Sequence, residues 1–165
     1  TANAKAGKPA GIQMKLNSLL DEEFVEALYI ASQSGVKVDL VIRGICSLKP
    51  GIPGLSENIK VRSVLGRFLE HSRIYHFVNG GEDEYWVGSA DLMHRNLDRR
   101  VESLVRIERP VHKASLQEIF DLSLSEETAS WHQNQDSWKH VGKNSKGEAL
   151  QDLQSLYIKR YKKAH

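Results

Sequence analysis

Two short polar clusters hold the side chains of this sequence that are best suited to chemistry. His71 and Arg73 are separated by one residue, and a Gly-Ser-Ala-Asp run at 88–91 brings in Ser89 further along the chain. An imidazole that can accept or donate a proton, a planar guanidinium and a small hydroxyl donor together suit a phosphoryl group. The sequence therefore indicates a phosphate site, provided that the fold brings the two clusters together.

The segment between the two clusters predicts the feature that would join them. Apolar runs at 74–78 and 85–87 flank an Asn-Gly-Gly turn, which is typical of a β-hairpin. A hairpin would bring His71 close to Ser89. It would also place Arg73 on the same strand and the same face as the histidine.

Upstream, the pattern predicts a β-α-β unit whose strand ends carry two more candidate residues. Alternating apolar and polar residues indicate a strand over 11–16, an N-cap aspartate before an apolar stripe indicates a helix over 21–35, and a β-branched run indicates a strand over 36–42. In parallel β-α-β units the ligand-facing residues lie at the carboxyl ends of the strands. Asn17 and Arg43 fall there, although an arginine at this point can also be a solvated strand end.

Downstream patterns complete a mixed α/β fold, for which we expect one mixed β-sheet flanked by helices. The sequence shows no internal repeat and no long low-complexity tract. The predicted elements are a strand over 59–62, one or two helical turns over 63–69, a polar loop over 91–96, a strand over 101–107 ended by Pro110, an amphipathic helix over 113–131, a short strand over 138–141 and a final helix over 150–163.

Length and composition limit the class of protein. The 165 residues and 40% hydrophobic content suit one buried core, so we expect a single domain over 1–165. A net charge of +2 argues against a general nucleic-acid binder but allows a focused anion site. The lone Cys46 favours a reducing compartment, and no Cys or His spacing suggests a zinc site.

No apolar run in the sequence reaches the length of a membrane span. The start at Thr1 predicts a piece excised from a longer protein.

Several longer motifs resemble the last domain of the bacterial polyphosphate kinase family. The resemblance runs from about Gly7 to about Leu124, and it rests on four segments that follow one another in that family's order: 41–59, 68–73, 89–91 and 95–102. The His-x-Arg and Gly-Ser pattern is also similar to the His-x-Lys and Gly-Ser motif of the phospholipase D superfamily, with Arg73 in place of the lysine. The resemblance therefore implies a phospholipase D-like domain.

The resemblance further implies an activity, a cofactor and a set of partners. Such kinases reversibly transfer the terminal phosphate of ATP to long-chain inorganic polyphosphate through a phosphohistidine, which lies in a preceding domain that this chain lacks. The chain alone is thus expected to be inactive, with Mg²⁺ held mainly by residues outside it and with no metal ligand of its own. The expected partners are ATP or ADP, polyphosphate, the preceding domains and further copies in a homo-oligomer, without nucleic acid. The expected location is the cytoplasm, with peripheral membrane association and no membrane span.

For the site itself, the resemblance makes His71 the catalytic residue, through phosphate binding and acid-base assistance. It makes Arg43 a contact of the nucleotide phosphates, whereas Arg73 can instead pair with Glu70 or a neighbouring carboxylate. For Asp91 and Asn96, hydrogen bonds within their loop are at least as good an account as ligand contact. The expected ATP- or phosphate-binding residues are Arg43, His71, Arg73, Ser89 and Arg100, with Arg62 toward the mouth of the pocket.

Two alternatives remain open at this point. The first is a phosphodiesterase or nuclease of the phospholipase D type, which usually needs two His-x-Lys copies, whereas this chain has one copy with arginine. The second is a non-catalytic anion-binding or oligomerisation module. His76 is better explained by packing than by chemistry, because no partner spacing accompanies it.

Overall fold

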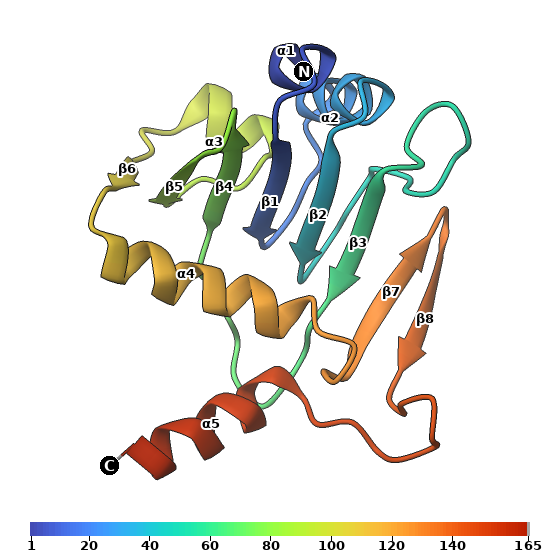
Figure 1. The fold of residues 1–165 in the computed structure, drawn as a ribbon, viewed down its shortest axis with the longest axis vertical. Coiled ribbons are helices and arrows are strands. Elements are labelled where there is room, and N and C mark those ends of the chain that lie inside the picture. The colour runs from blue at the N-terminus through green and yellow to red at the C-terminus, as the bar shows by residue number, and fades with distance from the viewer. Residues whose placement is uncertain (165) are drawn as a thin grey trace.

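A single mixed β-sheet organises the chain (Figure 1). The computed structural model describes residues 1–164, and within them the sheet has eight strands in the order β6-β5-β4-β1-β2-β3-β7-β8. The strands are β1 (Ala10–Leu16), β2 (Lys37–Ile42), β3 (Ile59–Ser63), β4 (Ile74–Asn79), β5 (Glu82–Gly88), β6 (Leu104–Ile107), β7 (Ser130–Asn134) and β8 (Ser137–Val141). The helices are α1 (Ala2–Lys5), α2 (Glu22–Gln33), α3 (His94–Arg99), α4 (Pro110–Ser123) and α5 (Leu153–Ala164).

The centre of the sheet is the predicted parallel unit. β1 pairs in parallel with β2, and β2 pairs in parallel with β3, so that Leu40 lies opposite both Met14 and Val61. All three of these side chains are buried. The flanking pairs are antiparallel, with β4 beside β1 and β7 beside β3. The prediction of a mixed sheet flanked by helices is therefore confirmed.

Helices pack on both faces of this sheet, and Figure 1 shows α4 crossing one of them. α2 begins where the Asp21 carboxylate accepts a hydrogen bond from the backbone N–H of Phe24 at 3.1 Å, as the predicted N-cap should. Its buried Leu28 and Ala31 join the main hydrophobic core on one face. α4 crosses the other face, where Phe120 is fully buried. None of the helices described for residues 1–164 is both long and apolar enough to span a bilayer.

The predicted hairpin is confirmed, with one difference that matters for the site. β4 and β5 pair through Gly80 and Gly81, whose φ angles of 68° and 101° suit glycine in a tight turn. At the open end, the backbone N–H of Gly88 donates to the carbonyl of Arg73 at 3.2 Å. His71 lies before β4 begins, in an extended segment rather than on the strand itself.

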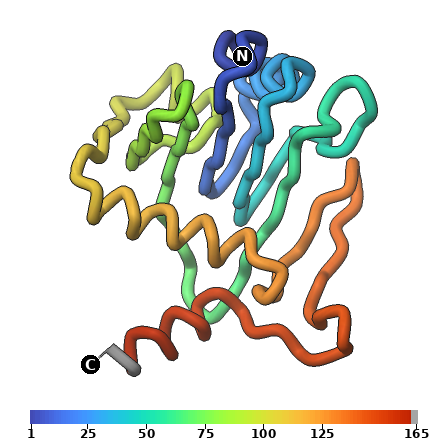
Figure 2. The backbone as a smooth tube through the Cα atoms, viewed as in Figure 1, coloured from blue at the N-terminus to red at the C-terminus, as the bar shows by residue number. Residues whose placement is uncertain are grey.

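That extended segment replaces the helical turns predicted over 63–69. Figure 2 shows the chain leaving the sheet after β3, reaching the level of α5 and returning to β4. At the far point of this segment, the side-chain amide of Gln154 in α5 makes two hydrogen bonds to the backbone of Phe68. The amide oxygen accepts from the Phe68 N–H at 2.6 Å, and the amide nitrogen donates to the Phe68 carbonyl at 2.7 Å. These contacts satisfy the backbone of Phe68 at this bend, which periodicity along the sequence cannot reveal.

Two other predicted elements differ from the structure. The helix predicted over 113–131 runs from Pro110 to Ser123, and Pro110 starts this helix as well as following the preceding strand. The Thr128 hydroxyl donates to the Leu122 carbonyl at 2.7 Å, which satisfies the end of the helix before β7 pairs with β3. Within the loop predicted over 91–96, α3 already begins at His94.

Removing the anchor of α4 should destabilise the domain. Phe120 is completely buried, so we expect Phe120→Ala to lower the free energy of unfolding of the 165-residue chain by about 3–5 kcal/mol. Val111 lies on the same helix with 60% of its surface exposed, and Val111→Ala should change stability by less than about 0.5 kcal/mol. Urea denaturation followed by circular dichroism measures both values. Similar losses in the two variants would contradict this account of how α4 is held.

Candidate phosphate-binding site

A polar cavity of about 510 Å³ lies at the edge of the sheet where β1, β2 and β5 end and β4 begins. The topology makes this edge a meeting point, because the carboxyl ends of the parallel strands and the open end of the hairpin coincide there. The cavity is lined by Asn17, Ser18, Arg43, His71, Arg73, Ser89, Asp91, Met93, Arg95, Asn96 and Arg100. All five residues expected to bind ATP or phosphate are in this set, together with Arg95, which had not been expected.

Arg62 is the one expected residue that the structure places elsewhere. It does not line the cavity, and its side chain is only 8% exposed. Its guanidinium donates to the carbonyl of Ser125 at 3.1 Å and pairs with Glu126. The prediction that Arg62 lies near the mouth of the pocket is therefore wrong, because the side chain is used to hold the segment that follows α4.

Arg43 enters the cavity directly after β2. Its Nε and Nη2 atoms donate to the side-chain oxygen of Asn17 at 3.2 and 3.0 Å. Within residues 1–164, no carboxylate lies within ion-pairing distance of this guanidinium. The positive charge is thus held in place by a neutral group and remains uncompensated, which suits the binding of an anion.

His71 is exposed at the cavity and is oriented by Arg73. The Nη1 atom of Arg73 lies 3.0 Å from Nδ1 of His71 and 3.2 Å from the His71 carbonyl oxygen. Because a guanidinium only donates hydrogen bonds, Nδ1 must accept, so the ring in this arrangement is neutral with its proton on Nε2. The Nε2–H group can then donate to a phosphate oxygen.

Arg73 itself is largely committed to protein groups. Its Nη2 atom lies 2.8 Å from the Asp91 carboxylate, and the two side chains are only 10% and 8% exposed. Glu70, the other partner considered for it, instead pairs with the buried Lys15 at 2.7 Å. As arranged here, Arg73 supports His71 more directly than it offers donors to a ligand.

Asp91 collects several hydrogen bonds. Besides Arg73, the backbone N–H of Asn17 donates to it at 2.7 Å, the Asn17 side-chain amide at 3.2 Å and the Ser18 N–H at 3.3 Å. Burial alone would raise the pKa of this carboxyl, but the hydrogen bonds from Arg73 and Asn17 outweigh burial and hold the pKa of Asp91 below its ordinary value. The loop before Asp91 is fixed too, since the Tyr75 hydroxyl donates to the Ala90 carbonyl at 2.8 Å.

Glu102 is a supporting residue that the sequence reasoning missed. It accepts hydrogen bonds from the Ser89 hydroxyl and from the Asn96 amide, the latter at 2.7 Å, and these lower the pKa of Glu102. Arg100 lies 3.3 Å from the same carboxylate with half of its side chain exposed. Ser89 also accepts from the Ser103 N–H at 2.9 Å, so its hydroxyl is used within the loop. The sequence signal that could have identified Glu102 is its position just after the arginine-rich run at 95–100.

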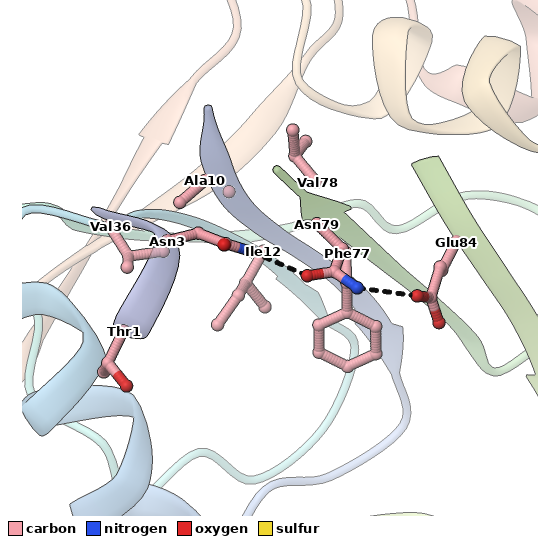
Figure 3. Close-up of a pocket in the computed structure, with 10 residues that line it drawn as sticks. Thr1, Asn3, Ala10, Ile12, Val36, Phe77, Val78, Asn79 and Glu84 are labelled. Carbon is pink, nitrogen blue, oxygen red and sulfur yellow. Dashed lines mark hydrogen bonds between the residues drawn. The ribbon is translucent and has the colours of Figure 1, made fainter. Parts of the chain in front are cut away.

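A second hollow, at the opposite end of β1, lacks these features. In Figure 3 a chain of hydrogen bonds runs from Asn3 to Asn79 at 2.6 Å and on to Glu84 at 2.9 Å. This cavity of about 260 Å³ has one acidic side chain and no Lys, Arg or His among the described residues that line it. It does not suit a phosphate.

Comparison with known proteins gives a consistent family. The family model described as "Polyphosphate kinase C-terminal domain 2" matches residues 1–153. A polyphosphate kinase of Streptomyces coelicolor is 55% identical over 155 residues, which are 93% of this chain and 21% of that protein. A polyphosphate kinase of Mycobacterium avium is 48% identical over 151 residues, 92% of this chain and 20% of that protein. The chain thus spans about a fifth of the length of these relatives.

Solved structures show the same relation at the level of the fold. The crystal structure of a polyphosphate kinase from Porphyromonas gingivalis matches with a TM-score of 0.87 and 33% identity, over 99% of this chain and 26% of that one. Nuc from Salmonella typhimurium, a phospholipase D family member, matches with a TM-score of 0.54 and 16% identity, over 84% of this chain and 86% of that one. The second likeness shows a shared fold alone, and it confirms the expected phospholipase D-like architecture.

The buried Asp91 should give the domain a specific sensitivity to acid. Because its folded pKa lies below the ordinary value of 3.8, its stabilising effect is fully present above that value and is lost as the pH falls through the folded pKa. We expect the melting temperature of the 165-residue chain to drop as the pH falls from about 4 to about 2, and to drop less in Asp91→Asn. Circular dichroism melts across this range measure both slopes.

The exposed Asp98 supplies the control for this experiment. Asp98→Asn removes a carboxylate without removing a buried hydrogen-bonded one, so its melting temperature should follow that of the wild type at every pH. An unchanged acid slope in Asp91→Asn would contradict the assignment of this sensitivity to Asp91.

Proposed function

This chain belongs to the polyphosphate kinase family as its second C-terminal domain, and from this premise we propose that its cavity forms the phosphate-binding half of the active site of a phosphotransferase. The single observation that carries the proposal is the convergence of the uncompensated Arg43 with the oriented, donating His71. The longer protein would reversibly move the terminal phosphate of ATP to inorganic polyphosphate. Since the chain spans only about a fifth of its relatives, that activity would need the preceding domains.

In phosphoryl transfer, such a half-site would form no covalent bond itself. The bond between the β–γ bridging oxygen and the γ-phosphorus of ATP breaks, a bond from that phosphorus to a histidine nitrogen of a preceding domain forms, and ADP leaves. A terminal polyphosphate oxygen then displaces the histidine. In both steps, charge on the transferred group is stabilised by groups already in position. Arg43 would neutralise the phosphate oxygens, and the Nε2–H of His71 would donate to one of them.

Polyphosphate itself is a long and dense anion, so it requires cations beyond the reacting group. Arg95 and Arg100 line the same cavity and are both exposed. We assign them to the chain of phosphates rather than to the transferred group. Arg73, which pairs with Asp91, would act by holding His71.

Magnesium, the expected cofactor, does not fit the described residues that line this cavity. Within the part of the chain that the structure describes, no three His, Cys, Asp or Glu side chains are grouped so as to hold a metal ion. Asp91, the carboxylate that lines the cavity, has its oxygens occupied by Asn17, Ser18 and Arg73. We therefore keep the proposal that Mg²⁺ is bound by residues of the preceding domains.

Anion binding by the isolated chain should depend on Arg43 and His71. We expect ATP and polyphosphate to shift backbone amide signals at Arg43, His71 and Ser89, and Arg43→Ala or His71→Ala to weaken binding about ten- to a hundredfold, the cost of a hydrogen bond to a charged group. His112→Ala removes an exposed histidine of α4 that does not line the cavity, and this variant should bind as the wild type does. NMR titration measures these affinities. Shifts spread evenly over all surface arginines would favour a non-specific anion-binding module.

In the full-length protein, the same histidine should control transfer. We expect His71→Ala to lower the rate of polyphosphate synthesis from ATP by about 10²–10⁴, the usual contribution of a proton-transferring or donating side chain, and His112→Ala to leave it unchanged. The assay follows incorporation of the terminal phosphate into polyphosphate, and a generic phosphodiester is supplied in parallel. Cleavage of that diester without synthesis of polyphosphate would favour the phosphodiesterase alternative instead.

A further inference from the structure

We propose that Asp91 is a positioning residue that orients Arg43 through the side-chain amide of Asn17. This inference rests on the proposed function, because it assigns Arg43 to the phosphates of ATP. Asp91 does not touch Arg43. Its effect passes through a relay of three side chains from three separate parts of the chain.

The relay is defined by its hydrogen bonds. Oδ2 of Asp91 accepts from Nδ2 of Asn17 at 3.2 Å, and Oδ1 of Asn17 accepts from both Nε and Nη2 of Arg43 at 3.2 and 3.0 Å. The amide between the two charged groups has a donor end and an acceptor end. The carboxylate can only accept and the guanidinium can only donate, so one orientation of Asn17 satisfies both neighbours.

The surroundings make this orientation firm. Asn17 and Asp91 are each about 6% exposed, so water has little access to replace a lost hydrogen bond. The other oxygen of Asp91 accepts from the backbone N–H groups of Asn17 and Ser18 at 2.7 and 3.3 Å. The carboxylate therefore fixes the backbone at the end of β1 and also sets which way the side-chain amide points.

An amide at position 91 would reverse the relay. Asp91→Asn keeps one acceptor, and the two backbone N–H groups at the end of β1 would hold it. The new NH₂ group would then face the donors of Asn17 and Arg73, which bind Oδ2 in the wild type. Asn17 can relieve this clash only by turning its oxygen toward position 91, which turns its NH₂ toward Arg43. Two donors would then face each other, and Arg43 would lose its hydrogen-bond acceptor.

Exchanging the two side chains should restore the Arg43 end of the relay. In the double variant Asn17→Asp/Asp91→Asn, a carboxylate at position 17 can accept from Arg43 with one oxygen and from the amide at position 91 with the other. The total charge is unchanged. Asn17→Asp alone instead places two buried carboxylates side by side, which is unfavourable. The exchange does not give Arg73 back its acceptor, so recovery should be partial.

The experiment uses the full-length protein and measures kcat and KM for ATP in polyphosphate synthesis, with calorimetric ATP binding in parallel. Each single variant should lose at least about tenfold in kcat/KM, with a raised KM and a raised Kd for ATP. The double variant should recover at least about threefold over Asp91→Asn in the same quantities. Asp21→Asn is the matched control, because Asp21 is a buried carboxylate whose N-cap role an asparagine can also fill.

Thermal melts of every variant separate positioning from folding, and assays are run well below the lowest melting temperature. If Asp91→Asn does not fold, Asn17→Ala replaces it, since it removes the relay and leaves Asp91 bound to Arg73; it too should lose about tenfold. Wild-type values in Asp91→Asn or Asn17→Ala, or a double variant no better than Asp91→Asn, would overturn the relay. An inactive wild type would overturn the proposed function instead, and the pattern of ATP dissociation constants would still decide the relay.

Discussion

A carboxylate that is removed from water needs hydrogen-bond donors for both of its oxygens, and most of the site depends on how Asp91 obtains them. The donors come from the end of β1 and from Arg73, just before β4, while Asp91 itself follows β5. One buried charge thus ties three strand ends together. Arg73 in turn holds the ring of His71, so the exposed part of the site is built on a buried, hydrogen-bonded part.

The exposed and the buried cations have different roles in this arrangement. Arg73 and Lys15 are paired with carboxylates and act within the structure, whereas Arg43 is held by a neutral amide and keeps its charge for an anion. The proposed polyphosphate site needs both kinds, because an unsupported arginine loses side-chain entropy when it binds. The uncompensated charge is placed at the strand end, where the fold leaves room for a ligand.

Much of this arrangement follows from local sequence patterns. The hairpin (74–88) and the β-α-β unit (10–42) are each specified by turn chemistry and periodicity within one short stretch of sequence, which is why Arg43, His71 and Ser89 could be placed at one edge. The pairings that escaped prediction join distant positions. Arg62 binds the segment after α4, Glu70 binds Lys15, and β7 pairs with β3, and none of these leaves a periodic trace in the sequence. The helix predicted over 113–131 failed for the same reason, since a hydroxyl at Thr128 and the partner strand decide where it stops.

The clamp between Gln154 and Phe68 has a consequence for the order of events during synthesis. It joins residues 86 positions apart and holds the extended segment that leads to His71. During translation this segment leaves the ribosome long before α5 does, and it cannot gain the contact until residue 154 has also emerged. The central strands can pair early, because their partners lie nearby in sequence. The nascent domain can therefore pair its central strands first, and it gains a fully ordered His71 segment among the last of its features.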